Sequence, residues 1–84
     1  MPYAVTLSSA AEKQLARLDR IAAHRLTVAM AGLADQPRPP GCKKLAGLDA
    51  WRIRVGAYRV VYQIHDARLL VLVVRVGHRR EVYG

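Results

Sequence analysis

The sequence is poor in cysteine, in acidic side chains and in long apolar runs, and each of these features excludes some classes of protein. Cys42 is the one cysteine among 84 residues, so an internal disulfide and a zinc site built from cysteines are excluded. The longest apolar run, residues 69–74, is far shorter than the roughly 20 residues that a membrane-spanning helix requires. No basic stretch followed by an apolar one marks a signal peptide at the N-terminus. These absences predict a protein of the reducing cytoplasm.

Acidic side chains are heavily outnumbered by basic ones. Six Asp and Glu residues stand against fourteen Lys and Arg residues, which gives a net charge of +8. On so small a body this charge creates a strong positive field, whose natural partner is a polyanion: nucleic acid first, an acidic protein second and a membrane surface last. Residues 43–84 carry nine of the basic and three of the acidic side chains, so we expect the polyanion site there. An arginine-rich composition inherited from a GC-rich genome is the alternative explanation.

The length fits a single domain of residues 1–84, and it leaves no room for a large cofactor cavity, so no cofactor is expected. Residues 3–7 alternate in character, which predicts a short strand. Apolar residues recur at helical spacing over residues 11–33, and a break near Asp19 predicts a helical hairpin. Ser9 and Glu12 have the spacing of a capping box at the start of its first helix. The prolines that follow predict a linker, which leads into a basic loop at residues 43–47.

Residues 51–55 begin the strand-rich second half, because apolar residues there alternate with arginines. Gly56 supplies the positive φ that a two-residue hairpin turn needs at its first central position. In the resulting register Arg54 faces Arg59, and Arg52 lies on the same face of the sheet. Like charges opposed in this way destabilise a sheet unless an anion lies between them. The arrangement therefore suggests a phosphate site.

Residues 69–76 are apolar at nearly every position, which predicts a central strand covered on both faces and ended by Gly77. A strand, two helices and an antiparallel meander together predict an α+β fold. In this fold the N-terminal strand and the helical hairpin pack on a mainly antiparallel β-sheet. The helices are expected on one face of the sheet and the arginines on the other.

Three segments of the second half carry a family resemblance. The segments are KKLAG at residues 43–47, WRIRVGAYRVVY at 51–62 and VGHRREVY at 76–83. In order and spacing they resemble the RelE/ParE superfamily of bacterial toxin–antitoxin toxins. The resemblance implies a RelE-like fold and a toxin held inactive by an antitoxin that is encoded beside it. In the RelE branch, it further implies cleavage of messenger RNA in the ribosomal A site by metal-independent attack of the ribose 2′-hydroxyl on phosphate.

The resemblance also assigns roles to individual residues. The catalytic positions of the branch fall on Arg59, Arg79 and Tyr83, and two basic strand positions fall on Arg52 and Arg54. Guanidinium groups suit the stabilisation of the extra negative charge on a pentacovalent phosphate, and Tyr83 would orient the nucleotide or stack on a base. The full expectation is a catalytic set of Arg54, Arg59, His78, Arg79 and Tyr83, an RNA-binding set of Lys43, Lys44, Arg52 and Arg80, and no metal ligands.

The general base is open at this point. Lysines stand at positions 52 and 54 in the best-known members, and arginine is a poor base because its pKa exceeds about 12. His78 is the natural candidate, since the ordinary pKa of imidazole lies near neutrality. Glu81, then Lys43 or Lys44, and last Arg54 follow it in order of preference.

A ParE-like toxin that inhibits DNA gyrase by binding alone is the alternative from another functional class. The joint presence of Arg59, His78, Arg79, Arg80 and Tyr83 favours cleavage, because a pure binder does not need them. A corepressor and an inactive relic are further alternatives. The expected partners are an acidic RelB-like antitoxin in a hetero-oligomer, messenger RNA and the 70S ribosome. Operator DNA is expected only through the antitoxin, and no membrane is expected.

Overall fold

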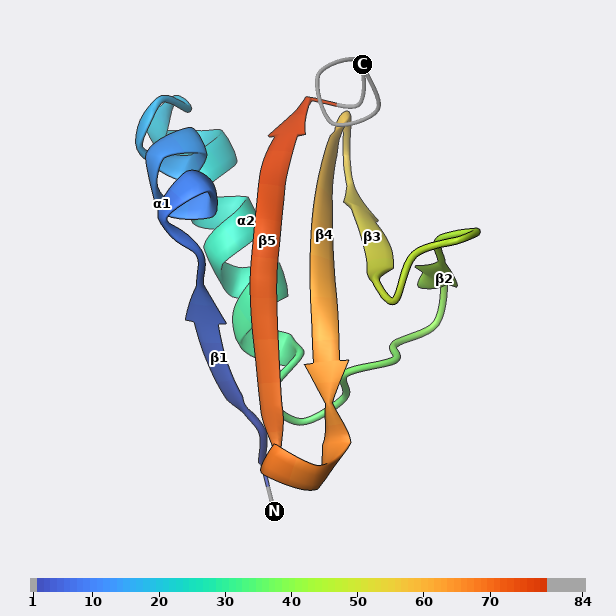
Figure 1. Cartoon of the computed structure of the whole chain (residues 1–84). Coiled ribbons are helices and arrows are strands. Elements are labelled where there is room, and N and C mark those ends of the chain that lie inside the picture. The colour runs from blue at the N-terminus through green and yellow to red at the C-terminus, as the bar shows by residue number, and fades with distance from the viewer. Residues whose placement is uncertain (1, 79–84) are drawn as a thin grey trace.

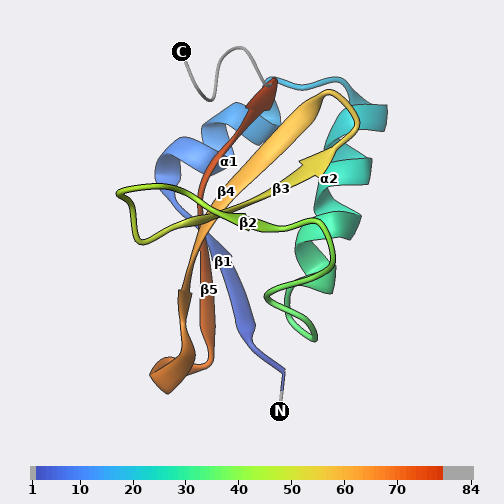
Figure 2. The ribbon, with the colours of Figure 1, turned by 90° about the vertical axis from the view of Figure 1, so that its right-hand side faces the viewer.

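The computed structural model describes residues 2–78, which form a five-stranded sheet with two helices (Figure 1). The strands are β1 (Ala4–Leu7), β2 (Lys43–Lys44), β3 (Trp51–Val55), β4 (Tyr58–His65) and β5 (Leu70–His78), and the helices are α1 (Ser9–Ala16) and α2 (Arg20–Gly32). The strand order is β1-β5-β4-β3-β2, antiparallel throughout except for the parallel β1–β5 pair. Helix α2 lies along one face of the sheet (Figure 2), while α1 packs against β5. The predicted α+β architecture is confirmed.

Both helices begin at side-chain caps. The Ser8 hydroxyl accepts a hydrogen bond from the Ala11 N–H at 3.1 Å, and the Asp19 carboxylate accepts one from the Ala22 N–H at 2.7 Å. Asp19 therefore separates the two helices, which confirms the predicted helical hairpin. The predicted capping box of Ser9 and Glu12 is wrong, because α1 starts one residue earlier and Glu12 lies past the third helical position.

The core lies between the sheet and the helices. Its fully buried members are small and medium aliphatic side chains from both layers, together with Tyr62. The Tyr62 hydroxyl donates a 2.7 Å hydrogen bond to the carbonyl oxygen of Pro37, and burial raises the pKa of this phenol far above its ordinary value. Tyr62 thereby ties the proline-rich linker to the sheet.

The predicted β3–β4 hairpin is confirmed in its register as well as its position. Gly56 adopts a φ of +62°, and Val55 pairs with Tyr58, Arg54 with Arg59 and Ile53 with Val60. The prediction of a basic loop from residue 43 onward is wrong at its start, because Lys43 and Lys44 form β2 and pair with β3. The sheet therefore extends one strand beyond the hairpin and carries these lysines at its edge.

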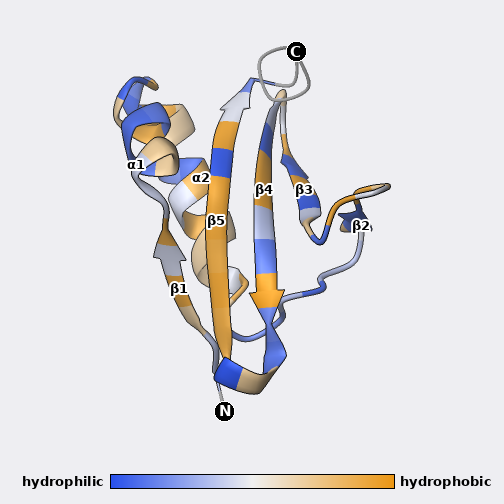
Figure 3. Ribbon diagram, viewed as in Figure 1, coloured by the Kyte–Doolittle hydropathy of each residue, from blue (hydrophilic) through white to orange (hydrophobic). Residues whose placement is uncertain are grey.

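Strand β5 is apolar over most of its length (Figure 3), yet the prediction that both its faces are covered is wrong. Val71, Val73 and Val76 are buried on the helix side, whereas Arg75 is exposed on the other face. The strand also runs on through Gly77 to His78 rather than stopping before the glycine. One face of the sheet is thus open, as the arginine pattern of β3 indicates.

A bulge at Val74 sets which side chains of β5 reach the open face. Val61 pairs with Arg75 and Tyr62 with Val73, which leaves Val74 without a partner in the register. The start of α1 holds this bulge: the Ser8 hydroxyl donates to the Val74 carbonyl oxygen at 3.0 Å. Six residues further on, the Gln14 side-chain oxygen accepts from the Val76 N–H at 2.8 Å. The α1–β5 contact therefore fixes the orientation of the strand end that leads into the candidate site.

An ionic cluster closes the opposite end of the sheet. Arg38 in the linker contacts Asp66 through two hydrogen bonds of 2.9 and 3.3 Å, and its guanidinium lies 5.1 Å from the ring centre of Trp51. Tyr3 donates a further hydrogen bond of 2.6 Å to Asp66. Arg38 and Tyr3 together hold the pKa of Asp66 below its ordinary value.

Candidate functional site

Arg54 and Arg59 face each other across β3 and β4 on the open face of the sheet. Their neighbours in the hairpin, Gly56, Ala57 and Tyr58, complete with them a small hollow of about 130 Å³. Arg54 is exposed and Arg59 is half-buried. Two cations at opposed positions repel each other, and an anion between them relieves that repulsion. The hollow is thus suited to a phosphate group.

A second row of side chains crosses the open face two residues away. Register pairs align Lys43 with Arg52, Arg52 with Val61 and Val61 with Arg75, which spans four strands from β2 to β5. Together with Arg54 and Arg59, this row forms a basic surface, here called the arginine face. A polyanion that lies on it meets cations contributed by every strand except β1.

Arg52 was expected on the RNA-binding surface, but the residue is only 6% exposed. Its Nε atom is buried without a hydrogen-bond partner among the described residues. The alternation of β3 places Arg52 on the arginine face as predicted, but Lys43 and Val61 flank it on the neighbouring strands. Its positive charge therefore lies beneath this surface rather than on it.

Arg75 was not recognised in the sequence as a separate site residue. It interrupts the apolar run of β5, and this single charge in an otherwise apolar strand is the signal that could have identified it. If both faces of β5 were covered, Arg75 would not be expected at the surface. The bulge at Val74 places Arg75 opposite Val61 and so on the arginine face.

His78 lies at the end of β5, opposite Tyr58 in the register. The two rings meet edge to face with their centres 6.0 Å apart. Tyr58 packs against the core, so the imidazole projects from the helix side of the sheet and not from the arginine face. Lys44 pairs with Trp51 and has the same orientation by alternation. The structure therefore brings Lys43, Arg52, Arg54 and Arg59 to one face and separates His78 and Lys44 from them.

The remaining predicted site residues, Arg79, Arg80 and Tyr83, lie outside the described residues, as does Glu81. Over residues 2–78, no group of three or more His, Cys, Asp or Glu side chains gathers in a way that could hold a metal ion. Neither helix in the same part of the chain has the length and apolar character needed to cross a membrane.

The described residues form a two-layer α+β domain whose sheet carries basic side chains on the side away from the helices. The family model described as "ParE toxin of type II toxin-antitoxin system, parDE" matches residues 5–83. The chain is 34% identical to Toxin RelG of Mycobacterium tuberculosis over 99% of this chain and 98% of that protein. This chain therefore belongs to the RelE/ParE family of type II toxin–antitoxin toxins.

Solved structures agree with this assignment. The toxin–antitoxin complex RelBE2 of M. tuberculosis contains a chain that superposes with a TM-score of 0.80 at 32% identity, covering 94% of this chain and all of that one. A variant of Escherichia coli toxin RelE in the free state gives a TM-score of 0.82 at 30% identity, with 99% and 92% of the two chains covered. Both are RelE-type toxins, and the fold of this chain is RelE-like.

Proposed function

We propose that this toxin is a ribosome-dependent endoribonuclease that cleaves messenger RNA in the A site and thereby stops translation. The observation that carries the proposal is the opposed pair Arg54 and Arg59, which lines a hollow on the open face of the sheet. The family resemblance assigns a catalytic role to Arg59 and a basic strand position to Arg54. The likeness to RelE-type toxins over nearly the whole chain supports the same reaction.

The reaction is an in-line displacement that these residues suit chemically. The ribose 2′-oxygen forms a bond to the adjacent phosphorus, the bond from phosphorus to the 5′-oxygen breaks, and a 2′,3′-cyclic phosphate is left upstream. Arg54 and Arg59 stabilise the additional negative charge that develops on the phosphoryl oxygens. Arg79 acts with them, and Tyr83 orients the nucleotide. The 2′-hydroxyl proton passes to a base, and the 5′-oxygen gains a proton as it leaves.

The candidates for the general base lie on different sides of the sheet. Lys43 and Arg54 lie on the arginine face, while His78 and Lys44 project from the helix side. The RNA contacts that we propose are made by Lys43 on the arginine face and by Arg80, with Arg52 adding positive potential from beneath the surface. Lys44, which projects from the helix side, is left out of this set. The ribosome supplies the bent geometry of the message that in-line attack requires, so free RNA is cut slowly.

The partner that restrains the toxin is an acidic antitoxin of the RelB type. The +8 charge of the chain demands a complementary negative surface. RelE-type relatives from M. tuberculosis and E. coli have been crystallised in toxin–antitoxin complexes. An antitoxin that covers the arginine face neutralises the phosphate site directly.

The test is primer extension on a defined message with purified toxin and programmed 70S ribosomes. Sharp cuts in the A site are expected for the wild type, and Arg59→Ala or Arg79→Ala should reduce them by about 10²–10³-fold. Arg68→Ala is the matched control, because it removes an exposed arginine from the turn at the far end of β4 and β5. Equal loss in all three variants would show that net charge, and not the placement of Arg59 and Arg79, governs the activity.

The alternative is gyrase inhibition of the ParE type, favoured by the family model whose description names a ParE toxin. The same protein preparations should therefore be tested for inhibition of DNA supercoiling by gyrase. Inhibition of supercoiling without ribosomal cleavage would replace the nuclease proposal with this one.

A further inference from the structure

The guanidinium group of Arg25 lies against the turn between β3 and β4. A methyl group placed on Gly56 would lie 3.3 Å from Nη2, 3.4 Å from Nη1 and 3.6 Å from Cζ of Arg25. Both Nη atoms lie nearer to this position than Cζ does, so the guanidinium turns its Nη end toward the glycine. Its N–H donors therefore lie at the turn itself.

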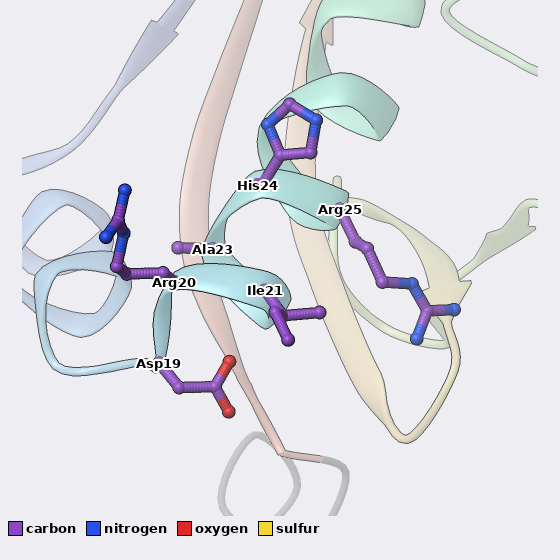
Figure 4. Close-up of a pocket in the computed structure, with 6 residues that line it drawn as sticks. All are labelled: Asp19, Arg20, Ile21, Ala23, His24 and Arg25. Carbon is purple, nitrogen blue, oxygen red and sulfur yellow. The ribbon is translucent and has the colours of Figure 1, made fainter.

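This contact brings a helix residue to the arginine pair. Figure 4 shows the Arg25 side chain reaching from α2 toward the β3–β4 hairpin. Gly56 also lines the hollow shared by Arg54 and Arg59. Arg25 thus approaches the turn from the helix side, while the pair projects from the open face. The tip of the hairpin carries positive charge on both sides of a backbone that has no side chain at Gly56.

The acidic group nearest in sequence does not neutralise this arginine. Asp19 caps α2 through its bond to the Ala22 N–H, and its carboxylate lies apart from the Arg25 guanidinium in Figure 4. Arg25 is exposed, so its donors are accessible to a ligand from solution. Arg20 is also exposed, but Figure 4 shows it on the side of the helix away from the hairpin.

We propose that Arg25 binds an RNA phosphate next to the one held by Arg54 and Arg59, so that the single strand bends around the β3–β4 turn. The inference rests on the proposed function for the identity of the polyanion. The planar fork of arginine matches two oxygens of a phosphate, and a backbone contact of this kind adds affinity and positioning without reading the base. The RNA path therefore extends from the sheet onto α2.

The experiment measures the binding of a fluorescent oligouridine by anisotropy over a range of salt concentrations. Each phosphate contact on a single strand contributes about 0.7 to the slope of log K against log salt. Arg25→Ala should lower that slope by about 0.7 and weaken binding about tenfold at low salt. Arg25→Lys keeps the charge and should restore the slope. Arg20→Ala removes a cation from the same helix and should leave the slope unchanged.

Two outcomes overturn the inference. One is an equal effect of Arg25→Ala and Arg20→Ala on the slope, which would show that Arg25 acts only through the net charge of the protein. The other is an intact RNA slope in Arg25→Ala together with weaker binding of an acidic antitoxin, which assigns the residue to the protein partner. Ribosomal cleavage by the wild type is scored separately, so failure of the nuclease proposal is distinguishable from failure of the Arg25 contact.

Discussion

Replacement of Arg52 by methionine tests whether this buried arginine contributes more to the fold or to the RNA-binding surface. The side chain is 6% exposed, and its Nε atom has no hydrogen-bond partner among the described residues. An unmet buried N–H costs about 1–3 kcal/mol. Methionine retains the length of the stem and removes that N–H, so we expect Arg52→Met to be about 1 kcal/mol more stable than the wild type. Arg52→Ala also removes that N–H but loses two buried methylene groups, so it should be about 2 kcal/mol less stable than Arg52→Met.

Urea unfolding followed by the fluorescence of Trp51, the single tryptophan, measures both changes. Arg54→Met is the control, since it alters an exposed arginine on the same strand and should leave stability within about 0.5 kcal/mol. In the RNA-binding assay Arg54→Met should lose more affinity than Arg52→Met. If Arg52→Met destabilises the protein as much as Arg52→Ala does, the guanidinium makes a stabilising bond and the burial argument is wrong.

Three further predictions concern the surroundings of the site. Tyr62→Phe removes the hydrogen bond to Pro37 and should lower stability by about 1 kcal/mol in the same urea assay; an unchanged midpoint would mean that water replaces this bond. Gly56→Ala places a methyl group at φ +62° and against Arg25, so it should lower folding stability by about 1 kcal/mol or more and also reduce RNA affinity. A loss of stability with unchanged RNA affinity would contradict the coupling to Arg25. Asp66 has a lowered pKa, so its stabilising contribution is complete above the unfolded value of about 3.9 and is lost as the pH falls toward the folded value. Melting temperatures of the wild type should therefore fall more steeply in that acidic range than those of Asp66→Asn, and parallel curves would rule out this cluster as the cause.

The hairpin shows how much of the fold local sequence can predict. Gly56 fixes the turn, and the turn fixes the register that opposes Arg54 to Arg59, so this part of the arginine face follows from a few adjacent residues. The helical hairpin follows in the same way from apolar spacing and the break at Asp19. These features depend on interactions between residues close in sequence.

The bulge on β5 could not be predicted from the local sequence. Val74 lies within an apolar run, and the groups that hold the strand there, Ser8 and Gln14, come from the other end of the chain. Without knowledge of that contact, the position of Arg75 on the open face and of His78 on the helix side is not predictable. The burial of Arg52 is likewise not predictable from β3 alone, whose alternation gives Arg52 and the exposed Arg54 the same face.

The parallel pairing of β1 with β5 has a consequence for the order in which the sheet forms. Ala4 pairs with Leu70, 66 positions later, and the remainder of β1 pairs with residues up to Val73. A nascent chain cannot complete the sheet until these last residues have emerged, because such distant contacts form only after nearly the whole polypeptide is available. The β1–β5 pair is therefore expected to form among the last steps of folding, after the hairpin of β3 and β4.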